Sequence, residues 1–251
     1  MRLSFSGQTV LIAGGSCDMA IELAGLLIEA GLRPILSFRS PEGREKIMAA
    51  LPFSIDLYQT CGLDFSRRDT LSTVFDDLPQ GPDYLVDFAQ GDYETLVSSA
   101  DTRKTDCFLE ENIAFRAAFL KKTTRLMIKK KFGRLVFVSS GAAGRPNQGQ
   151  GFYAASKLAA EALYKNIALE LGSFGISSVS LRPGYVACGR GKSFIENNQD
   201  RLIRQIPNRH WLSSRDVAET IVFLLSDGAR GFNATELVMD GGIGSGKHFF
   251  A

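Results

Sequence analysis

The sequence has few of the residues that build metal sites or disulfide frameworks. Only four cysteines and two histidines, His210 and His248, occur among its 251 residues, and no two cysteines form a Cys-x-x-Cys pair. Zinc sites and disulfide-stapled folds need such residues clustered at short spacings. We therefore predict no metal centre, and the cysteines are expected to be free, mostly buried thiols in a reducing compartment.

Long apolar runs and a strong charge of either sign are also lacking. No stretch approaches the ~20 apolar residues of a membrane span, and residues 1–7 are too short and polar for a signal sequence. The net charge of +2 gives no overall attraction to nucleic acid or membrane. We expect a cytoplasmic protein that binds neither. The basic run at residues 121–131 alternates with apolar residues, which favours a solvated helix face over a phosphate-binding surface.

Linkers, repeats and low-complexity tracts are absent too, and apolar runs alternate with amphipathic segments throughout. We predict strands at 9–13, 34–38, 84–88, 134–139, 177–182 and 236–239. Helices should begin near residues 19, 43, 69, 106, 152 and 216, with Asp69 and Ser214 as caps. Strands that are apolar throughout are typical of a parallel sheet buried on both faces. The sequence thus predicts one α/β domain, residues 1–251, with a doubly wound parallel sheet of the Rossmann type.

A phenol and an ammonium lie four residues apart at Tyr153 and Lys157, and Ser140 precedes the tyrosine by thirteen residues. On a helix this spacing places both side chains on one face. The nearby ammonium favours the phenolate and lowers the pKa of the phenol, so that Tyr153 can act as an acid or base near neutral pH. Ser140 follows a predicted strand, where ligands bind in open α/β sheets, and can hydrogen-bond a carbonyl oxygen. Taken alone, a Tyr-x-x-x-Lys pair is more often a solvated helix surface.

With Asn112, these residues resemble the catalytic tetrad of the short-chain dehydrogenase/reductase family, and the resemblance covers nearly the whole chain. It implies that Tyr153 is the general acid/base and that Ser140 orients the substrate carbonyl. Lys157 would lower the tyrosine pKa and hold the nicotinamide ribose, while Asn112 would support a water that leads protons to the lysine. In length and layout the chain is most similar to the family's 3-oxoacyl-carrier-protein reductases.

The first predicted strand ends in a glycine-containing loop that leads into a helix. Glycines let the backbone approach a pyrophosphate, and the helix N-terminus supplies unpaired amides. The family pattern Thr-Gly-x-x-x-Gly-x-Gly retains Gly14, but Ala13, Asp18 and Ala20 stand at its other fixed positions. Asp18 would repel a pyrophosphate unless its side chain turns away and caps the helix. We favour the cap over the alternative, a weakened affinity for the cofactor.

Two further segments depart from the family pattern. Asp87-Phe88-Ala89-Gln90 stands where the family typically has Asn-Asn-Ala-Gly, and only Ala89 is retained. Phe88 and Gln90 either alter the cofactor pocket or merely repack it, and the regular strand before them favours repacking. Cys188 replaces a threonine that usually contacts the nicotinamide amide, and a thiol is a weaker donor.

The end of the second predicted strand bears on the choice of cofactor. NAD enzymes usually carry an acidic residue there for the ribose 2′-hydroxyl, but this chain has Phe38 followed by Arg39. A guanidinium suits a 2′-phosphate, so we predict NADPH over NADH, the alternative for Arg39 being an exposed loop arginine. Many NADP enzymes carry a second basic residue where this chain has Cys17. The resemblance implies cofactor contacts at Gly14, Ser16, Asp18, Met19, Arg39, Asp64, Phe65, Ala89, Tyr153, Lys157, Pro183, Gly184 and Val186, with Asp64 facing the adenine amino group.

In this family the substrate is set largely by the segment after the sixth strand, here residues 189–211. Its glycines and charges predict a moving lid. Its basic residues suit an anionic or carrier-protein-bound substrate, and equally a solvated surface: Arg190, Lys192, Arg201, Arg204 and Arg209.

Three functional hypotheses follow. The first is an NADPH-dependent enzyme that reduces a 3-oxoacyl thioester or polyketide-like ketone to a secondary alcohol. The second is an alcohol or sugar dehydrogenase of the same family. The third is a catalytically idle protein that binds a dinucleotide or a partner, which the intact tetrad disfavours. The resemblance also implies a homotetramer or dimer built through the helices around Asn112 and Tyr153. The apolar residues of these helices could form the interface or equally the core: Ala114, Phe115, Ala118, Phe119, Ala159, Ala162 and Leu163.

Overall fold

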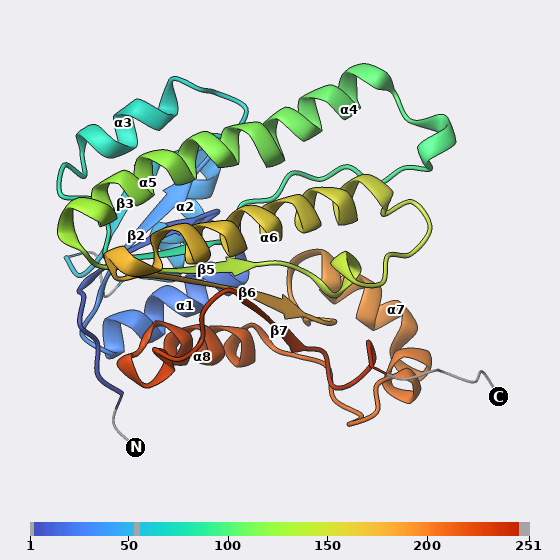
Figure 1. Cartoon of the computed structure of the whole chain (residues 1–251). Helices are drawn as coiled ribbons and strands as arrows, with labels where there is room; N and C mark the ends of the chain where they lie inside the picture. Colours follow the sequence, from blue (N-terminus) through green and yellow to red (C-terminus); the bar gives the residue numbers. More distant parts are fainter. Residues whose placement is uncertain (1–2, 53–55, 246–251) are drawn as a thin grey trace.

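Short apolar runs form most strands of one parallel sheet (Figure 1). The computed structural model describes residues 3–52 and 56–245, and these strands run in the order β3-β2-β1-β4-β5-β6-β7. Every neighbouring pair is parallel. The predicted fold class, a doubly wound α/β sheet in a single domain, is confirmed. The strands are β1 (Thr9–Ala13), β2 (Arg33–Phe38), β3 (Gln59–Gly62), β4 (Tyr84–Asp87), β5 (Gly133–Val138), β6 (Ile176–Pro183) and β7 (Thr235–Met239).

Helices cover both faces of the sheet, as the uniformly apolar strands require. One face packs against α1 (Asp18–Glu29), α2 (Pro41–Ala50) and α8 (Ser214–Leu225). The other face packs against α3 (Thr70–Asp76), α5 (Arg116–Lys130) and α6 (Gly151–Leu171). Helix α4 (Thr102–Leu109) runs into α5, and α7 (Gly189–Gln205) follows β6.

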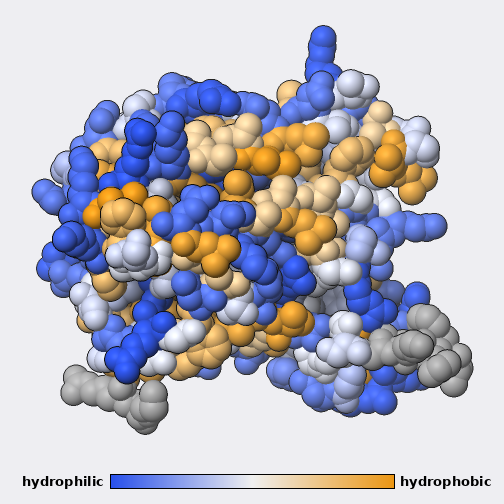
Figure 2. Space-filling view, viewed as in Figure 1, coloured by the Kyte–Doolittle hydropathy of each residue, from blue (hydrophilic) through white to orange (hydrophobic). Residues whose placement is uncertain are grey.

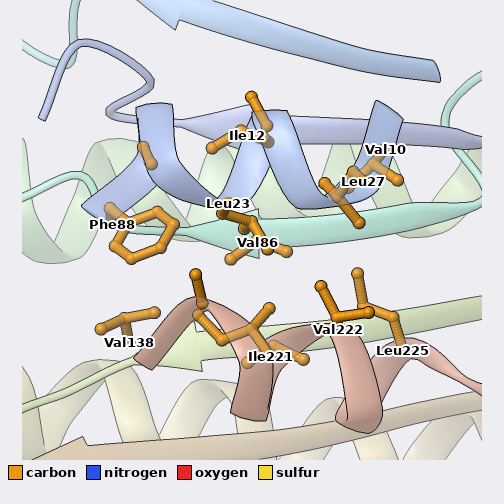
Figure 3. Packing of buried hydrophobic residues seen from close by; sticks show 14 of the residues in the cluster. Val10, Ile12, Leu23, Leu27, Val86, Phe88, Val138, Ile221, Val222 and Leu225 are labelled. Carbon is orange, nitrogen blue, oxygen red and sulfur yellow. The ribbon is translucent and has the colours of Figure 1, made fainter. Parts of the chain in front are cut away.

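The core beneath α1 and α8 explains one departure from the family pattern (Figure 3). Leu23 and Leu27 of α1 face Ile221 of α8 over one face of the central strands. Phe88 lies in this cluster and is only 8% exposed. Phe88 is therefore a core residue, which supports repacking at this position.

The structure corrects three details of the sequence prediction. Strand β3 was missed because its sequence, Gln-Thr-Cys-Gly, contains no apolar run. Asp69 makes no side-chain capping bond at α3 and pairs with Arg67 at 2.6 Å instead. Helix α8 is capped by Ser213, not Ser214, because Ser213 and Asp216 form a reciprocal capping box.

Other expectations from composition can be checked on the same structure. The four cysteines are free, but only Cys61 is buried and Cys107 is exposed. Within the described ranges, no group of three or more potential ligands could hold a metal ion, and His248 lies outside them. The described helices include none long and apolar enough to cross a membrane. Lys121, Lys122 and Arg125 are exposed on α5, as a solvated face predicts.

We expect Asp83→Asn to lower the free energy of unfolding by about 1 kcal/mol, because a partly exposed carboxylate loses charge-assisted hydrogen bonds that solvent partly screens. Asp83 accepts the backbone N–H groups of Gln8 and Thr9 at 2.8 and 2.9 Å, and it pairs with Lys130. Burial alone would raise the pKa of Asp83, but hydrogen bonds from Lys130, Thr9 and Gln8 outweigh it and hold the pKa below its usual value.

Because the pKa of Asp83 is lowered on folding, its stabilisation is complete above the unfolded value of about 3.9 and disappears as the pH falls through the folded value. Urea unfolding at neutral and acidic pH should therefore show a difference between wild type and Asp83→Asn that shrinks in acid. A difference that does not depend on pH would contradict this account.

Candidate active site

Helix α6 places Tyr153 and Lys157 on one face at the carboxyl edge of the sheet. The Lys157 Nζ lies 5.8 Å from the centre of the Tyr153 ring. Lys157 is only 3% exposed, and its ammonium donates to the Val138 carbonyl at 2.8 Å and lies 4.9 Å from the centre of the Phe137 ring. Strand β5 therefore holds the ammonium beside the phenol. A cation so placed favours negative charge on the phenol oxygen.

Ser140 lies just beyond the last residue of β5. Its Oγ accepts the backbone N–H of Ala142 at 3.1 Å and so caps the short 3₁₀ helix Gly141–Ala143. Because an oxygen lone pair serves this bond, the hydroxyl proton is available for donation. The Ser140 hydroxyl can therefore donate a hydrogen bond at the carboxyl end of β5.

Asn112 lies in a π-helical segment, Glu110–Phe115, between α4 and α5. The side chain is 1% exposed, and its Nδ2 donates to the Phe108 carbonyl at 2.8 Å. Its Oδ1 accepts the N–H of Gly91, which follows β4, at 2.9 Å. Asn112 therefore joins the bent helix to the loop after β4. The sequence predicted a helix here but not the π-helical turn, a feature that is frequent at functional sites.

The sheet places these four residues at one edge. Strands β4 and β5 are parallel neighbours, so their carboxyl ends lie at the same edge. Gly91, which holds Asn112, follows β4, while Val138 and Ser140 come from the end of β5. Helix α6 then returns over the same edge with Tyr153 and Lys157.

The glycine loop after β1 fits a dinucleotide phosphate. A Cβ on Gly14 (φ +72°) would lie 2.8 Å from the Ala89 nitrogen, and one on Gly15 would lie 2.8 Å from the Ser37 nitrogen. Only glycine permits this close packing against β2 and β4. The N-cap of α1, Cys17, makes no side-chain capping bond, so the amides of the first turn can bind an anion. Ser16 precedes this turn and Met19 lies within it.

Asp18 does not cap α1, and the predicted cap is wrong. Its carboxylate accepts Lys46 Nζ of α2 at 2.6 Å and the backbone N–H of Gly189 at 3.0 Å. The hydrogen bond from Lys46 is the main cause that holds the pKa of Asp18 below its usual value. Asp18 therefore links the glycine loop to α2 and to the first residue of α7. Sequence reasoning missed Lys46, which lies 28 residues from Asp18.

At the end of β2, Arg39 is exposed, as the predicted phosphate contact requires. Asp64 accepts the N–H and hydroxyl of Ser66 at 3.0 and 2.8 Å, and the Phe65 ring packs on Phe115 at 4.7 Å. Burial is the main cause that raises the pKa of Glu111; Asp64 raises it further and Arg39 lowers it. Glu111 is thus an acidic neighbour of Arg39 that the sequence analysis did not identify.

Strand β6 ends at Pro183 and leads to the last group of predicted cofactor contacts. A Cβ on Gly184 would lie 2.9 Å from the Asp240 Cα, so the chain passes close to the end of β7. Val186 forms a parallel bridge with Leu212 and so joins the two ends of the segment that contains α7. Burial raises the pKa of the Cys188 thiol, which therefore stays neutral at ordinary pH.

Helix α7 has buried apolar residues, an aromatic contact and exposed basic residues. Its buried residues are Ile195 and Leu202, while the Phe194 ring stacks on Tyr185 at 5.6 Å. The side chain of Arg190 lies outside the described residues. The other basic residues of the segment are exposed: Lys192, Arg201, Arg204 and Arg209.

Comparisons with known proteins agree with this geometry. A family model described as Enoyl-(Acyl carrier protein) reductase matches residues 16–244. The chain is 26% identical to the 3-oxoacyl-[acyl-carrier-protein] reductase FabG of Rickettsia prowazekii (strain Madrid E), and the match covers 96% of this chain and 98% of the relative. It is 28% identical to the 3-oxoacyl-[acyl-carrier-protein] reductase MabA of Mycobacterium bovis (strain ATCC BAA-935 / AF2122/97), with coverage of 96% and 95%.

Solved structures show the same fold. A levodione reductase superposes with a TM-score of 0.86 at 24% identity, covering 97% of this chain and all of that chain. A gluconate 5-dehydrogenase from Burkholderia cenocepacia J2315, in complex with NADP and tartrate, superposes with a TM-score of 0.88 at 21% identity, covering 98% of each chain. At these identities the structures support the fold alone.

Proposed function

Since the chain belongs to the short-chain dehydrogenase/reductase family and is an NAD(P)-dependent oxidoreductase, we propose that it uses NADPH to reduce a ketone to a secondary alcohol. One observation carries this proposal. The Lys157 ammonium, held by the Val138 carbonyl, lies beside the Tyr153 ring at the carboxyl edge of β5. This arrangement suits a proton donor whose conjugate base is stabilised by a cation.

The chain's own residues account for proton transfer and orientation. When bound, NADPH supplies the hydride. The Tyr153 hydroxyl donates its proton to the substrate oxygen, and Ser140 donates a hydrogen bond to that same oxygen. The Lys157 cation stabilises the phenolate left on Tyr153. Asn112 holds the Gly91 loop beside the site.

Two features support NADPH over NADH. The acidic residue typical of NAD enzymes is replaced by Phe38, and the exposed Arg39 follows it. The residues that would hold the dinucleotide are Gly14 with the first turn of α1, Arg39, and Lys157 at the ribose.

The substrate is proposed to be a 3-oxoacyl thioester, as the names of the curated relatives suggest. The segment 189–211 would act as the lid over it. The exposed basic side chains on and after α7 suit an anionic carrier or phosphopantetheine group.

The first experiment is a titration with NADPH and with NADH, followed by nicotinamide fluorescence, and then turnover assays. We expect tight binding of NADPH, much weaker binding of NADH, and reduction of a 3-oxoacyl thioester. A sugar acid oxidised in preference to thioester reduction would replace the substrate proposal. Binding of neither nucleotide would contradict the whole assignment and favour the idle protein.

We expect Lys46→Ala to weaken NADPH binding about threefold to tenfold at low ionic strength. The substitution leaves the Asp18 carboxylate without its cation next to the turn that would hold the pyrophosphate. Asp18→Asn/Lys46→Ala should restore the affinity, because the uncompensated charge is gone. Fluorescence titration of the three proteins tests this, and equal affinities at low salt would contradict it.

We also propose a homo-oligomer that uses the outer face of α5 and α6. Figure 2 shows apolar residues on the face where these helices lie side by side, and Leu158 and Leu169 of α6 are 46% and 67% exposed. Phe115 and Phe119 belong to the core, being 1% and 0% exposed. Light scattering should give a dimeric or tetrameric mass, and a monomer would contradict the proposal.

A further inference from the structure

A buried ion pair lies next to the candidate active site, in the segment Asp87-Phe88-Ala89-Gln90 that departs from the family pattern. Asp87, at the end of β4, and Arg116, at the start of α5, are both 0% exposed. The Arg116 Nε donates to Asp87 Oδ2 at 2.9 Å, and the Tyr164 hydroxyl donates to the same oxygen at 2.8 Å. Burial and the Asp87 carboxylate raise the pKa of Tyr164, so its hydroxyl stays protonated and remains a donor. The other Asp87 oxygen accepts the Ala89 N–H at 2.9 Å.

The rest of the Arg116 guanidinium binds main chain at the candidate active site. Its Nη1 donates to the Asn112 carbonyl at 2.6 Å, and its Nη2 donates to the Ala89 carbonyl. The backbone N–H of Arg116 bonds to the Ile113 carbonyl. In a regular α-helix the Arg116 N–H would bond to the Asn112 carbonyl four residues earlier. Here the guanidinium donates to that carbonyl instead. One planar side chain connects the loop after β4 to the main chain of Asn112.

Stability alone does not explain such a pair. Replacing a buried ion pair with apolar residues of similar volume is often neutral or stabilising, whereas removing one partner is strongly destabilising. The fixed fork of a guanidinium does, however, set the relative position of three acceptors, which an ammonium or apolar side chain cannot do. The geometry points to a role in positioning.

We propose that Arg116 is a positioning residue, with Asp87 as its counterion, that fixes the Asn112 main chain and the Ala89 loop relative to each other. This inference rests on the proposed function of the same site. It also explains the exchange of the family's asparagine for Asp87, because a carboxylate is needed opposite a buried guanidinium.

The pair also affects the charge balance around the proton donor. The Phe137 ring centre lies 5.2 Å from the Arg116 Cζ and 4.9 Å from the Lys157 Nζ, so two cations flank one ring. Asp87 is the counterion of the first. The charged and titratable groups facing this region are Asp87 from β4, Arg116 from α5, Tyr153, Lys157, Tyr164 and Glu161 from α6, and Arg182 from β6, which pairs with Glu161.

Arg116→Lys separates geometry from charge. The ammonium keeps the charge but cannot span three acceptors, so we expect kcat to fall about tenfold or more with the pH profile unchanged. Amide hydrogen exchange at Gly91, whose N–H bonds to Asn112 Oδ1, should become faster. Met127→Ala is the control: Met127 is fully buried near the other end of the same helix, so the substitution should lower Tm and leave kcat and Gly91 exchange unchanged.

Asp87→Asn changes the charge and keeps the guanidinium, because Arg116 stays charged without a counterion. The extra cation favours the Tyr153 phenolate, so the loss of ketone reduction at high pH should move to lower pH by roughly half a unit or more. Asp87→Asn/Arg116→Met removes both charges and should fold normally, with the wild-type pH profile, a low kcat and fast Gly91 exchange.

The proposal would be overturned if Arg116→Lys and the double variant kept wild-type kcat and Gly91 exchange, and changed only Tm as Met127→Ala does. An unshifted pH profile in Asp87→Asn would overturn the part that concerns charge. If the wild-type protein reduced no ketone, the proposed function would fail, and Gly91 exchange would still decide the positioning role.

Discussion

Tyr153→Phe is expected to lower kcat for ketone reduction by between about 10² and 10⁴-fold, the usual contribution of a positioned general acid. The substitution removes the hydroxyl that donates the proton and leaves the ring in its place on α6. The ring still lies beside the buried Lys157. NADPH affinity, measured by fluorescence titration, should therefore stay within about threefold of wild type. A loss of kcat with cofactor binding retained would assign the proton-donor role to Tyr153.

Tyr84→Phe is the matched control for this substitution. Tyr84 is fully buried at the other end of the sheet, where its hydroxyl accepts the Gly7 N–H at 2.8 Å. Losing that hydroxyl should reduce stability by about 1 kcal/mol and leave kcat unchanged. Equal kcat values for Tyr153→Phe and wild type would remove the acid/base assignment and favour the idle protein.

Short-range patterns predicted most of the fold and the candidate site. The apolar runs of β1, β4, β5 and β6 are each buried between two helical layers, and burial on both faces is what makes such runs visible in a sequence. Tyr153 and Lys157 share a helix, so their spacing alone predicts that they are adjacent. The short polar strand β3 is defined by its neighbour β2 instead, and it gave no such signal.

What the sequence could not show are contacts between distant segments. Asp18 meets Lys46 across 28 residues and Gly189 across 171, and these contacts hold its carboxylate away from the α1 cap position. Asp87 meets Arg116 across 29 residues, where α5 begins directly after the π-helical turn. One local signal was available. Arg116 stands on the apolar side of the helix, between Phe115 and Phe119, and an arginine at such a position indicates a buried charged partner.

Arg39→Ala is expected to weaken NADPH binding about tenfold to 100-fold and to leave NADH binding unchanged, the range expected for charge-assisted hydrogen bonds to a phosphate. Arg39 is exposed at the carboxyl end of β2, next to the glycine loop. Only the 2′-phosphate distinguishes the two nucleotides, so the ratio of their dissociation constants isolates this contact. Titration of both nucleotides against wild type and variant measures it.

Two variants make the interpretation specific to this site. Arg33→Ala removes another exposed arginine, from the amino end of the same strand, and it should change neither affinity. Glu111→Gln removes the carboxylate that lies close enough to Arg39 for their charges to interact. Without that competitor, Arg39 should bind the 2′-phosphate more tightly, and NADPH affinity should rise severalfold. If Arg39→Ala weakened both nucleotides equally, the arginine would be contacting a part that they share, and the preference for NADPH would lose its physical basis.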